Sequence, residues 1–149
     1  MPARWQGIRI EKTMGRKPLL VLDDEPEIRE LIKMALGMLG YEVRAVANGV
    51  EGLKALETMH TPGLIILDLM MPVMDGIEFA KRLRRNPEHA KIPLIVISAY
   101  GHRAQEIPDL VEVFDKPMDF DLLKKMAIKY CGPKAPDSPQ NAPPTQTQP

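Results

Sequence analysis

The sequence predicts an α/β fold, a doubly wound five-stranded parallel sheet with helices on both faces. Short apolar runs such as Leu64–Leu67 (LIIL) show no polar alternation, which is typical of strands that are buried on both faces. Between these runs, apolar residues recur at helical spacing, so that strand and helix alternate along the chain. This alternation favours a parallel sheet with right-handed crossover helices.

The first half of the chain is expected to hold three strands and two helices. The strands are predicted at Pro18–Leu22, Tyr41–Val46 and Leu64–Leu67. Pro26 suits the first turn of a helix that Gly40 ends. Asn48, with Glu51 three residues later, resembles a capping box and opens a helix through Met59.

The second half repeats the pattern with two strands and three helical segments. Asp75 with Glu78 predicts the start of a helix through about Arg85. The strands are predicted at Leu94–Ile97 and Val111–Phe114. Asp119 is the expected N-cap of the last helix. The inner face of that helix would carry Phe120, Leu123, Met126, Ala127 and Tyr130.

The composition excludes several classes of protein. Lys plus Arg and Asp plus Glu each number 20 among 149 residues, so no net charge attracts nucleic acid or an anionic membrane. No apolar run approaches the ~20 residues that span a bilayer, so no membrane insertion is expected. The single cysteine, Cys131, excludes an internal disulfide and fits a reducing compartment. We therefore expect a cytoplasmic protein without a direct nucleic-acid partner.

The two ends of the chain differ in composition from the middle. Residues 1–16 show little periodicity and are expected to form a flexible N-terminal arm. Residues 17–131 are expected to form one domain, since a chain of this length holds one sizeable core. Residues 132–149 are rich in Pro, Gln and Thr and bury too little apolar surface to offset the entropy of ordering. They are expected to form a disordered tail.

Polar side chains follow four of the predicted strands. Asp23 and Asp24 follow the first, Asp68 the third, Ser98 the fourth and Lys116 the fifth. Parallel strands end at one edge of a sheet roughly 5 Å apart, where ligands bind in such folds. Three carboxylates so close repel one another, and a hard dication with oxygen ligands, best Mg²⁺, removes the conflict. Metal, ammonium, hydroxyl and an oxygen nucleophile together suit phosphoryl transfer.

Four segments resemble the receiver domains of bacterial response regulators, the phosphoacceptors of two-component phosphorelays. They are VLDDEPEIRELI, LIILDLMMPVMDGIEFAKRLR, IPLIVISAYG and FDKPM, within a resemblance that covers Pro18 to Tyr130. It implies the flavodoxin/CheY-like strand order 2-1-3-4-5. It also implies self-phosphorylation and autodephosphorylation that depend on Mg²⁺, rather than conventional enzyme activity.

The resemblance implies a role for each of these polar residues. Asp68 would be the phosphoacceptor, Lys116 would contact the phosphoryl group, and the hydroxyl of Ser98 would turn toward the phosphoryl oxygens. The implied metal ligands are Asp23, Asp24, Asp68 and the main-chain carbonyl of Met70.

The sequence departs from the family pattern before Lys116. The span from Ser98 is short by about one helical turn, so the fourth helix is expected to be short or irregular, near 102–107. The family's usual aromatic, three residues before the lysine, is replaced by Val113, and Phe114 should face the other way. One hypothesis makes Tyr100 the mobile aromatic in its place; the alternative is that Tyr100 only shields the acyl phosphate.

The expected function is that of a single-domain response regulator. A histidine kinase or a histidine phosphotransfer protein would be the donor, and an unknown downstream protein would receive the signal by contact. One alternative is a receiver-like adaptor that works independently of phosphorylation. Another is that the chain is an excised part of a larger kinase or regulator.

Overall fold

The computed structural model describes residues 15–133 and shows one five-stranded parallel sheet. The strand order is β2-β1-β3-β4-β5, and every neighbouring pair is parallel. The strands are β1 Leu19–Leu22, β2 Val43–Val46, β3 Leu64–Leu67, β4 Leu94–Ser98 and β5 Glu112–Asp115. The predicted fold class and strand order are therefore confirmed. The expected arm (1–16) and tail (132–149) lie almost wholly outside the described residues and stay predictions.

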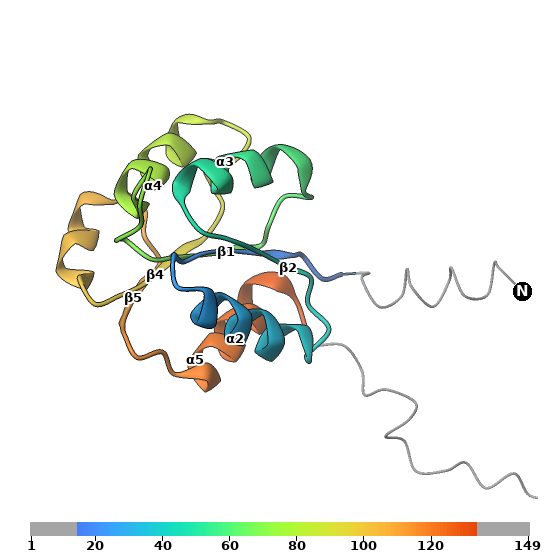
Figure 1. Cartoon of the computed structure of the whole chain (residues 1–149). Helices are drawn as coiled ribbons and strands as arrows, with labels where there is room; N and C mark the ends of the chain where they lie inside the picture. Colours follow the sequence, from blue (N-terminus) through green and yellow to red (C-terminus); the bar gives the residue numbers. More distant parts are fainter. Residues whose placement is uncertain (1–14, 134–149) are drawn as a thin grey trace, which may run out of the picture.

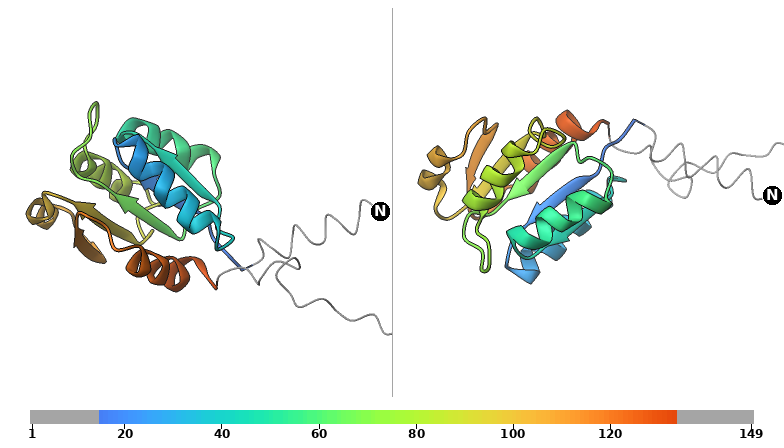
Figure 2. Two further views of the ribbon diagram at one scale, coloured as in Figure 1. Left: turned by 60° about the horizontal axis from the view of Figure 1, so that its bottom comes forward. Right: turned by 90° about the horizontal axis from the view of Figure 1, so that it is seen from above.

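Two pairs of helices cover the two faces of the sheet (Figures 1 and 2). Below it in Figure 1 lie α2 (Pro26–Gly37) and α5 (Phe120–Cys131). Above it lie α3 (Gly49–Thr58) and α4 (Gly76–Arg85). Across residues 15–133 no helix combines the length and the apolar character needed to cross a membrane.

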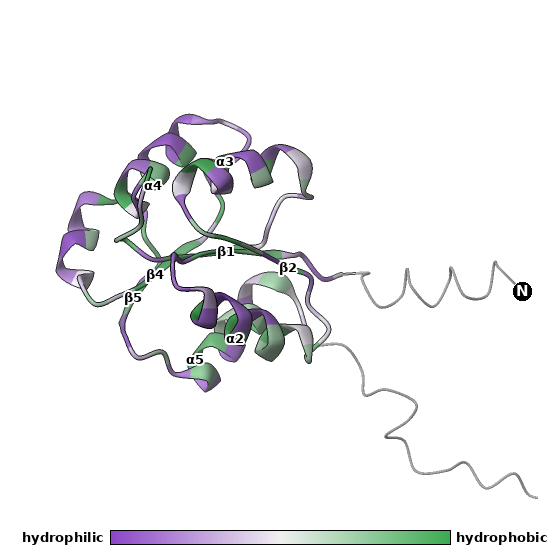
Figure 3. Cartoon of the chain, viewed as in Figure 1, coloured by the Kyte–Doolittle hydropathy of each residue, from purple (hydrophilic) through white to green (hydrophobic). Residues whose placement is uncertain are grey.

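Each face of the sheet has its own apolar core, and the strands supply both. Along β1, Leu20 and Leu22 belong to the core under α3 and α4, whereas Leu19 and Val21 belong to the core over α2 and α5. All four are fully buried. Alternate residues of a strand point to opposite faces, so a strand between two helical layers needs apolar residues throughout. Figure 3 shows this as green strands at the centre of the molecule.

The predicted helix caps form. The side chain of Asn48 accepts a hydrogen bond from the backbone N–H of Glu51 at 3.0 Å. Asp75 accepts from the N–H of Glu78 at 2.9 Å, and Asp119 accepts from Asp121 at 2.9 Å. Each cap pairs a backbone donor that the helix itself leaves unsatisfied, which positions the loops before α3, α4 and α5.

Several predicted boundaries were wrong by one to three residues. Helix α2 ends at Gly37, and the chain turns before Gly40, whose φ is +92°. Strand β2 begins at Val43 rather than Tyr41, because Tyr41 is buried in the core and its hydroxyl donates to the carbonyl of Gly132. Strand β1 begins at Leu19, and β4 extends to Ser98. Strand β5 lies one residue later than predicted, at Glu112–Asp115.

The fourth helical segment is short, as predicted. It is η1, a 3₁₀-helix at Gly101–Glu106, and Arg84 of α4 braces the loop that follows it. The Arg84 guanidinium donates to the carbonyl of Asp109 in this loop at 3.1 Å, and also to that of Ile92, before β4, at 2.8 Å. In a longer helix, backbone N–H groups would donate to more of these carbonyls. In this loop the Arg84 side chain supplies the donor instead.

Candidate functional site

The carboxyl edge of the sheet brings the predicted polar residues together. The N–H of Asp68 donates to the carbonyl of Leu22 at 2.9 Å, and the N–H of Asp23 donates to Val46 at 3.1 Å. The ladder between β1 and its two neighbours thus continues one residue past the strands. This fixes both carboxylates at the edge, and both residues are buried.

Four carboxylates form one cluster at this edge. Asp23, Asp24, Glu25 and Asp68 each offer a ligand atom, and these atoms all lie within 4.8 Å of one another. Asp23 and Asp68 are buried, whereas Asp24 and Glu25 are exposed. Glu25 was not among the site residues predicted from the sequence. Its place directly after the acidic pair, at the N-cap of α2, was the available signal.

The ammonium group of Lys116 lies among these acids. Its Nζ is 2.9 Å from Glu25 Oε1, 3.1 Å from Asp23 Oδ2 and 3.2 Å from Asp68 Oδ2. Burial by itself lowers the pKa of Lys116, but the hydrogen bonds to Glu25 and Asp23, together with the negative charges of Asp23 and Asp68, raise the pKa above its ordinary value. Lys116 is therefore a permanent cation in the site.

Asp23 is held in place by its surroundings. Its Oδ1 accepts from the N–H of Glu25 at 2.9 Å, and the Arg29 guanidinium donates to its carbonyl at 2.8 Å. Burial raises the pKa of the Asp23 carboxyl, although the hydrogen bond from the N–H of Glu25 and the contact with Lys116 partly offset that effect. Asp23 is therefore held by contacts to both its side chain and its main chain.

The loop after Asp68 packs tightly against the start of α4. The N–H of Met70 points to Asp68 Oδ1 at a long 3.4 Å, and the N–H of Gly76 donates to the carbonyl of Leu69 at 2.9 Å. A Cβ on Gly76 would lie only 2.3 Å from the carbonyl oxygen of Asp68. Glycine at 76 therefore allows the helix to begin directly beside the predicted phosphoacceptor.

Ser98 is fully buried at the end of β4. Its Oγ accepts a hydrogen bond from the N–H of Tyr100 at 3.1 Å. A serine hydroxyl can accept and donate at once, so its proton is still available to a ligand. The bond also links Ser98 to η1, because Tyr100 is the residue that precedes that segment. The Tyr100 side chain itself is 49% exposed.

The donor set of the cluster fits a hard dication. The acids supply only carboxylate oxygens, from which Mg²⁺ typically takes one or two ligands while keeping bound waters. The cluster already encloses the positive charge of Lys116, so its geometry suits a cation. Met70, whose carbonyl was predicted as a further ligand, lies in the same loop as Asp68 and is 44% exposed.

Two apolar hollows flank the loop that carries Lys116, which joins Pro117 through a cis peptide bond. One is a groove between α2 and the start of α5. Its apolar lining consists of Ile28, Leu31, Pro117, Met118 and Phe120, with Glu25 and Lys116 at its rim. This groove therefore opens beside the acidic cluster.

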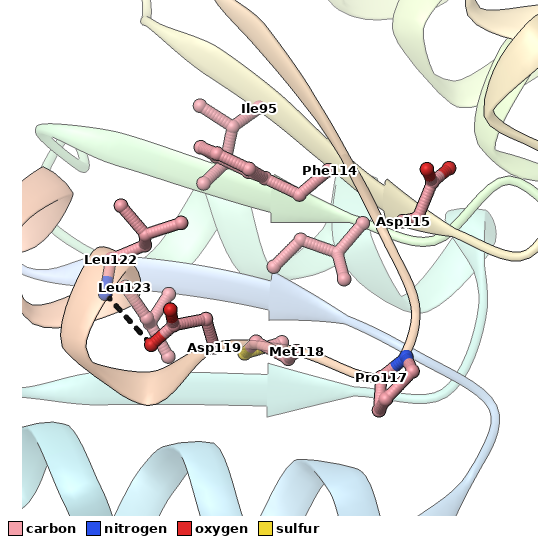
Figure 4. Close-up of a pocket in the computed structure, with 9 residues that line it drawn as sticks. Ile95, Phe114, Asp115, Pro117, Met118, Asp119, Leu122 and Leu123 are labelled. Atoms are coloured by element: carbon pink, nitrogen blue, oxygen red, sulfur yellow. Dashed lines mark hydrogen bonds between the residues drawn. The ribbon is translucent and has the colours of Figure 1, made fainter.

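The second hollow lies between β5 and α5 (Figure 4). Ile95, Phe114 and Leu122 line it, so Phe114 does face away from the side that holds η1, as predicted. One of its acids, Asp119, is engaged in capping α5, as the dashed line to Leu122 shows. An apolar hollow of this kind suits packing contacts rather than chemistry.

Comparisons with known proteins give a consistent assignment. The family model described as "Response regulator receiver domain" matches residues 19–128. The DNA-binding dual master transcriptional regulator RpaA of Synechocystis is 37% identical over 111 residues, which are 74% of this chain and 44% of that protein. The chain thus spans less than half the length of the first curated relatives it matches.

Shorter relatives match over nearly their whole length. Sporulation initiation phosphotransferase F of Bacillus subtilis is 34% identical over 121 residues, or 78% of this chain and 95% of that protein. Among solved structures, the response regulator TrrA of Thermotoga maritima, in complex with Mg²⁺ and BeF, is 35% identical with a TM-score of 0.64. The match covers 76% of this chain and 98% of that one.

Proposed function

The chain belongs to the response regulator receiver domain family of two-component systems, and from that premise we propose that it accepts a phosphoryl group on Asp68. The donor would be a phosphohistidine of a histidine kinase or of a histidine phosphotransfer protein, met in the cytoplasm. The observation that carries the proposal is the buried Asp68 carboxylate, 3.2 Å from the Lys116 ammonium within a cluster of acids.

The transfer needs one nucleophile and stabilisation of negative charge. An oxygen of Asp68 forms a bond to phosphorus as the bond from phosphorus to the donor's imidazole nitrogen breaks, and the electron pair of that bond stays on the nitrogen. Lys116 stabilises charge on the phosphoryl oxygens, and the Ser98 hydroxyl donates to one of them. Attack by water on the acyl phosphate later restores the free carboxylate and releases inorganic phosphate.

Magnesium is the proposed cofactor, with Asp23, Asp24, Asp68 and the carbonyl of Met70 as its protein ligands. When bound, it neutralises the repulsion among the acids and the incoming phosphoryl group. The chain's own residues do the rest: they hold the nucleophile at the end of β3 and keep a fixed cation beside it. Glu25 shares Lys116 with Asp23 and Asp68, so it sets how strongly the ammonium is held.

Phosphorylation by a small donor provides the direct test. The full chain is incubated with acetyl phosphate and Mg²⁺, and the added phosphoryl group is located by mass spectrometry of the fragments. We expect one phosphoryl group, on Asp68, which is lost when a chelator replaces Mg²⁺ and absent in Asp68→Asn. A wild-type chain that takes up no phosphoryl group would refute the proposal and favour the phosphorylation-independent adaptor.

The apolar groove beside Lys116 is a candidate docking site for a protein that donates the phosphoryl group. Leu31, Met34 and Met38 leave an exposed apolar stripe along α2, 47%, 62% and 81% accessible, which leads to this groove. A helix carrying a phosphohistidine could lay its apolar face there and present the imidazole to Asp68. We infer that the groove and stripe dock the donor, leaving the hollow between β5 and α5 for downstream contacts.

The Leu31→Glu variant tests that assignment. The donor is the histidine kinase that phosphorylates the wild-type chain fastest. We expect Leu31→Glu to slow labelling by this kinase by about tenfold, because an apolar anchor buried on binding typically contributes about 1–2 kcal/mol. Labelling by acetyl phosphate should not change. Leu122→Glu is the matched control, because Leu122 is 40% exposed and lines the other hollow. Equal slowing in both variants would contradict the groove as the docking site.

A further inference from the structure

The phosphorylated site has a charge problem that Lys116 alone does not solve. Among the described side chains, the cluster holds four carboxylates, and the Lys116 ammonium contacts three of them. With a bound dication, the four carboxylates and the ammonium would together carry a net charge of about −1 before phosphorylation. A phosphoryl group on Asp68 then replaces one negative charge by about two, within a partly buried site where charge is costly. A mobile cation at the edge of the site would favour the phosphorylated state specifically.

Arg29 and Arg103 both approach the site, and they are held very differently. The Arg29 guanidinium donates to the carbonyl of Asp23 at 2.8 Å, so it is committed to the backbone. Arg103 Nη1 lies 3.9 Å from Met70 Sδ, and its Nε lies 3.4 Å from Glu106. A thioether is a weak acceptor, and the Arg103 and Glu106 side chains are 41% and 50% exposed. Arg103 can therefore leave its present partners at little cost.

The short η1 segment explains why an arginine from this position reaches the site. Gly101, at the start of η1, packs so closely that a Cβ there would lie 3.0 Å from Val113 Cγ1 and 3.3 Å from Asp115 Oδ1. The backbone of η1 thus occupies space beside β5 at the position where the family usually has an aromatic. This close packing brings Arg103 over Met70, two residues after Asp68, whose carboxylate faces the Met70 N–H.

We propose that Arg103 binds the phosphoryl oxygens of phosphorylated Asp68, exchanging its contacts with Met70 and Glu106 for a charge-assisted pair. This inference rests on the proposed phosphorylation of Asp68. Ser98 adds a second link, since its hydroxyl is bonded to the N–H of Tyr100 just before η1. When Ser98 turns to the phosphoryl group, it releases the N–H of Tyr100 before η1, and when Arg103 turns, it releases Glu106 at the end of η1. The segment becomes the part of the surface that reports phosphorylation, and Arg103 shields the acyl phosphate from water.

The test compares Arg103→Ala and Arg103→Lys with Arg82→Ala in the full chain. Arg82 is a matched control, because it pairs with Glu78 at 3.0 Å and is 52% exposed on α4. Two quantities are measured: the affinity for beryllofluoride in saturating Mg²⁺, by calorimetry, and the lifetime of phosphorylated Asp68, by mass. Affinity for Mg²⁺ alone, measured the same way, reports whether the unphosphorylated site is intact.

We expect Arg103→Ala to weaken beryllofluoride binding and shorten the phosphorylated lifetime, each by about 3- to 10-fold, as removal of a partly exposed charge-assisted contact should. Arg103→Lys should recover part of the loss, and Arg82→Ala should match wild type. Binding of Mg²⁺ alone should be unchanged in all three variants. If Arg103→Ala behaves like Arg82→Ala while wild type is labelled on Asp68, this inference is wrong and the proposed function stands. If wild type is not labelled at all, the proposed function fails with it.

Discussion

Lys116→Met is expected to lower the free energy of unfolding by about 3 kcal/mol in the absence of divalent ions, the range for breaking a buried ion pair. The ammonium contacts Asp23, Glu25 and Asp68 within 3.2 Å, and its side chain is only 18% exposed. Its removal leaves two buried carboxylates without a cationic partner. Phosphorylation by acetyl phosphate should also slow by about 100-fold, as on loss of one preorganised charge-stabilising group. Urea unfolding and mass spectrometry measure the two effects.

Magnesium should restore part of the lost stability. In wild type the ammonium competes with a dication for the same carboxylates, so Mg²⁺ should raise the melting temperature of Lys116→Met more than that of wild type. Lys125→Met, the same change on an exposed position of α5, should show neither effect. Equal stability of Lys116→Met and wild type without metal would mean that the acids do not depend on this lysine.

The fold was predictable because its strongest constraints are local in the sequence. A central strand that is covered on both faces must be apolar at every position, and LLVL, LIIL and LIVI of β1, β3 and β4 meet that demand. Caps at Asn48, Asp75 and Asp119 likewise depend on a residue and its near neighbours. The error at Tyr41 arose where a contact distant in sequence decides the local structure. The sequence pattern predicts Tyr41 as a strand residue, but its hydroxyl donates a hydrogen bond to the carbonyl of Gly132, which directly follows α5.

The candidate site was predictable to the extent that it depends on strand ends. Parallel order alone places Asp23, Asp68 and Lys116 at one edge, and the structure brings them within hydrogen-bond reach. The participation of Glu25 depends on how the chain turns into α2, which no periodicity encodes. The approach of Arg103 depends on the close packing of η1 against β5. Sequence patterns therefore did not predict that Glu25 and Arg103 contact the site, because irregular segments position both side chains.

Gly76→Ala is expected to lower the free energy of unfolding by about 3 kcal/mol, the upper part of the range for an overpacked position. The new Cβ would lie 2.3 Å from the carbonyl oxygen of Asp68 and 2.9 Å from Leu69 Cα. Both are backbone atoms, so no rotamer change relieves the clash. The start of α4 must move away from the end of β3. This movement breaks the hydrogen bond from the N–H of Gly76 to the carbonyl of Leu69. Urea unfolding measures the loss.

Gly37→Ala supplies the matched control, because the same substitution at that position should raise the free energy of unfolding. A Cβ on Gly37 meets nothing within 4 Å, and the residue lies in the last turn of α2. Alanine in a helix restricts the unfolded chain, so we expect a gain of roughly 0.5–1 kcal/mol. Any Gly76→Ala protein that remains folded should also be phosphorylated more slowly, since the backbone that holds the Asp68 carboxylate beside Lys116 has shifted. Equal stability of the two variants would show that the contact between α4 and the end of β3 is loose, and the close packing inferred for the site would then be wrong.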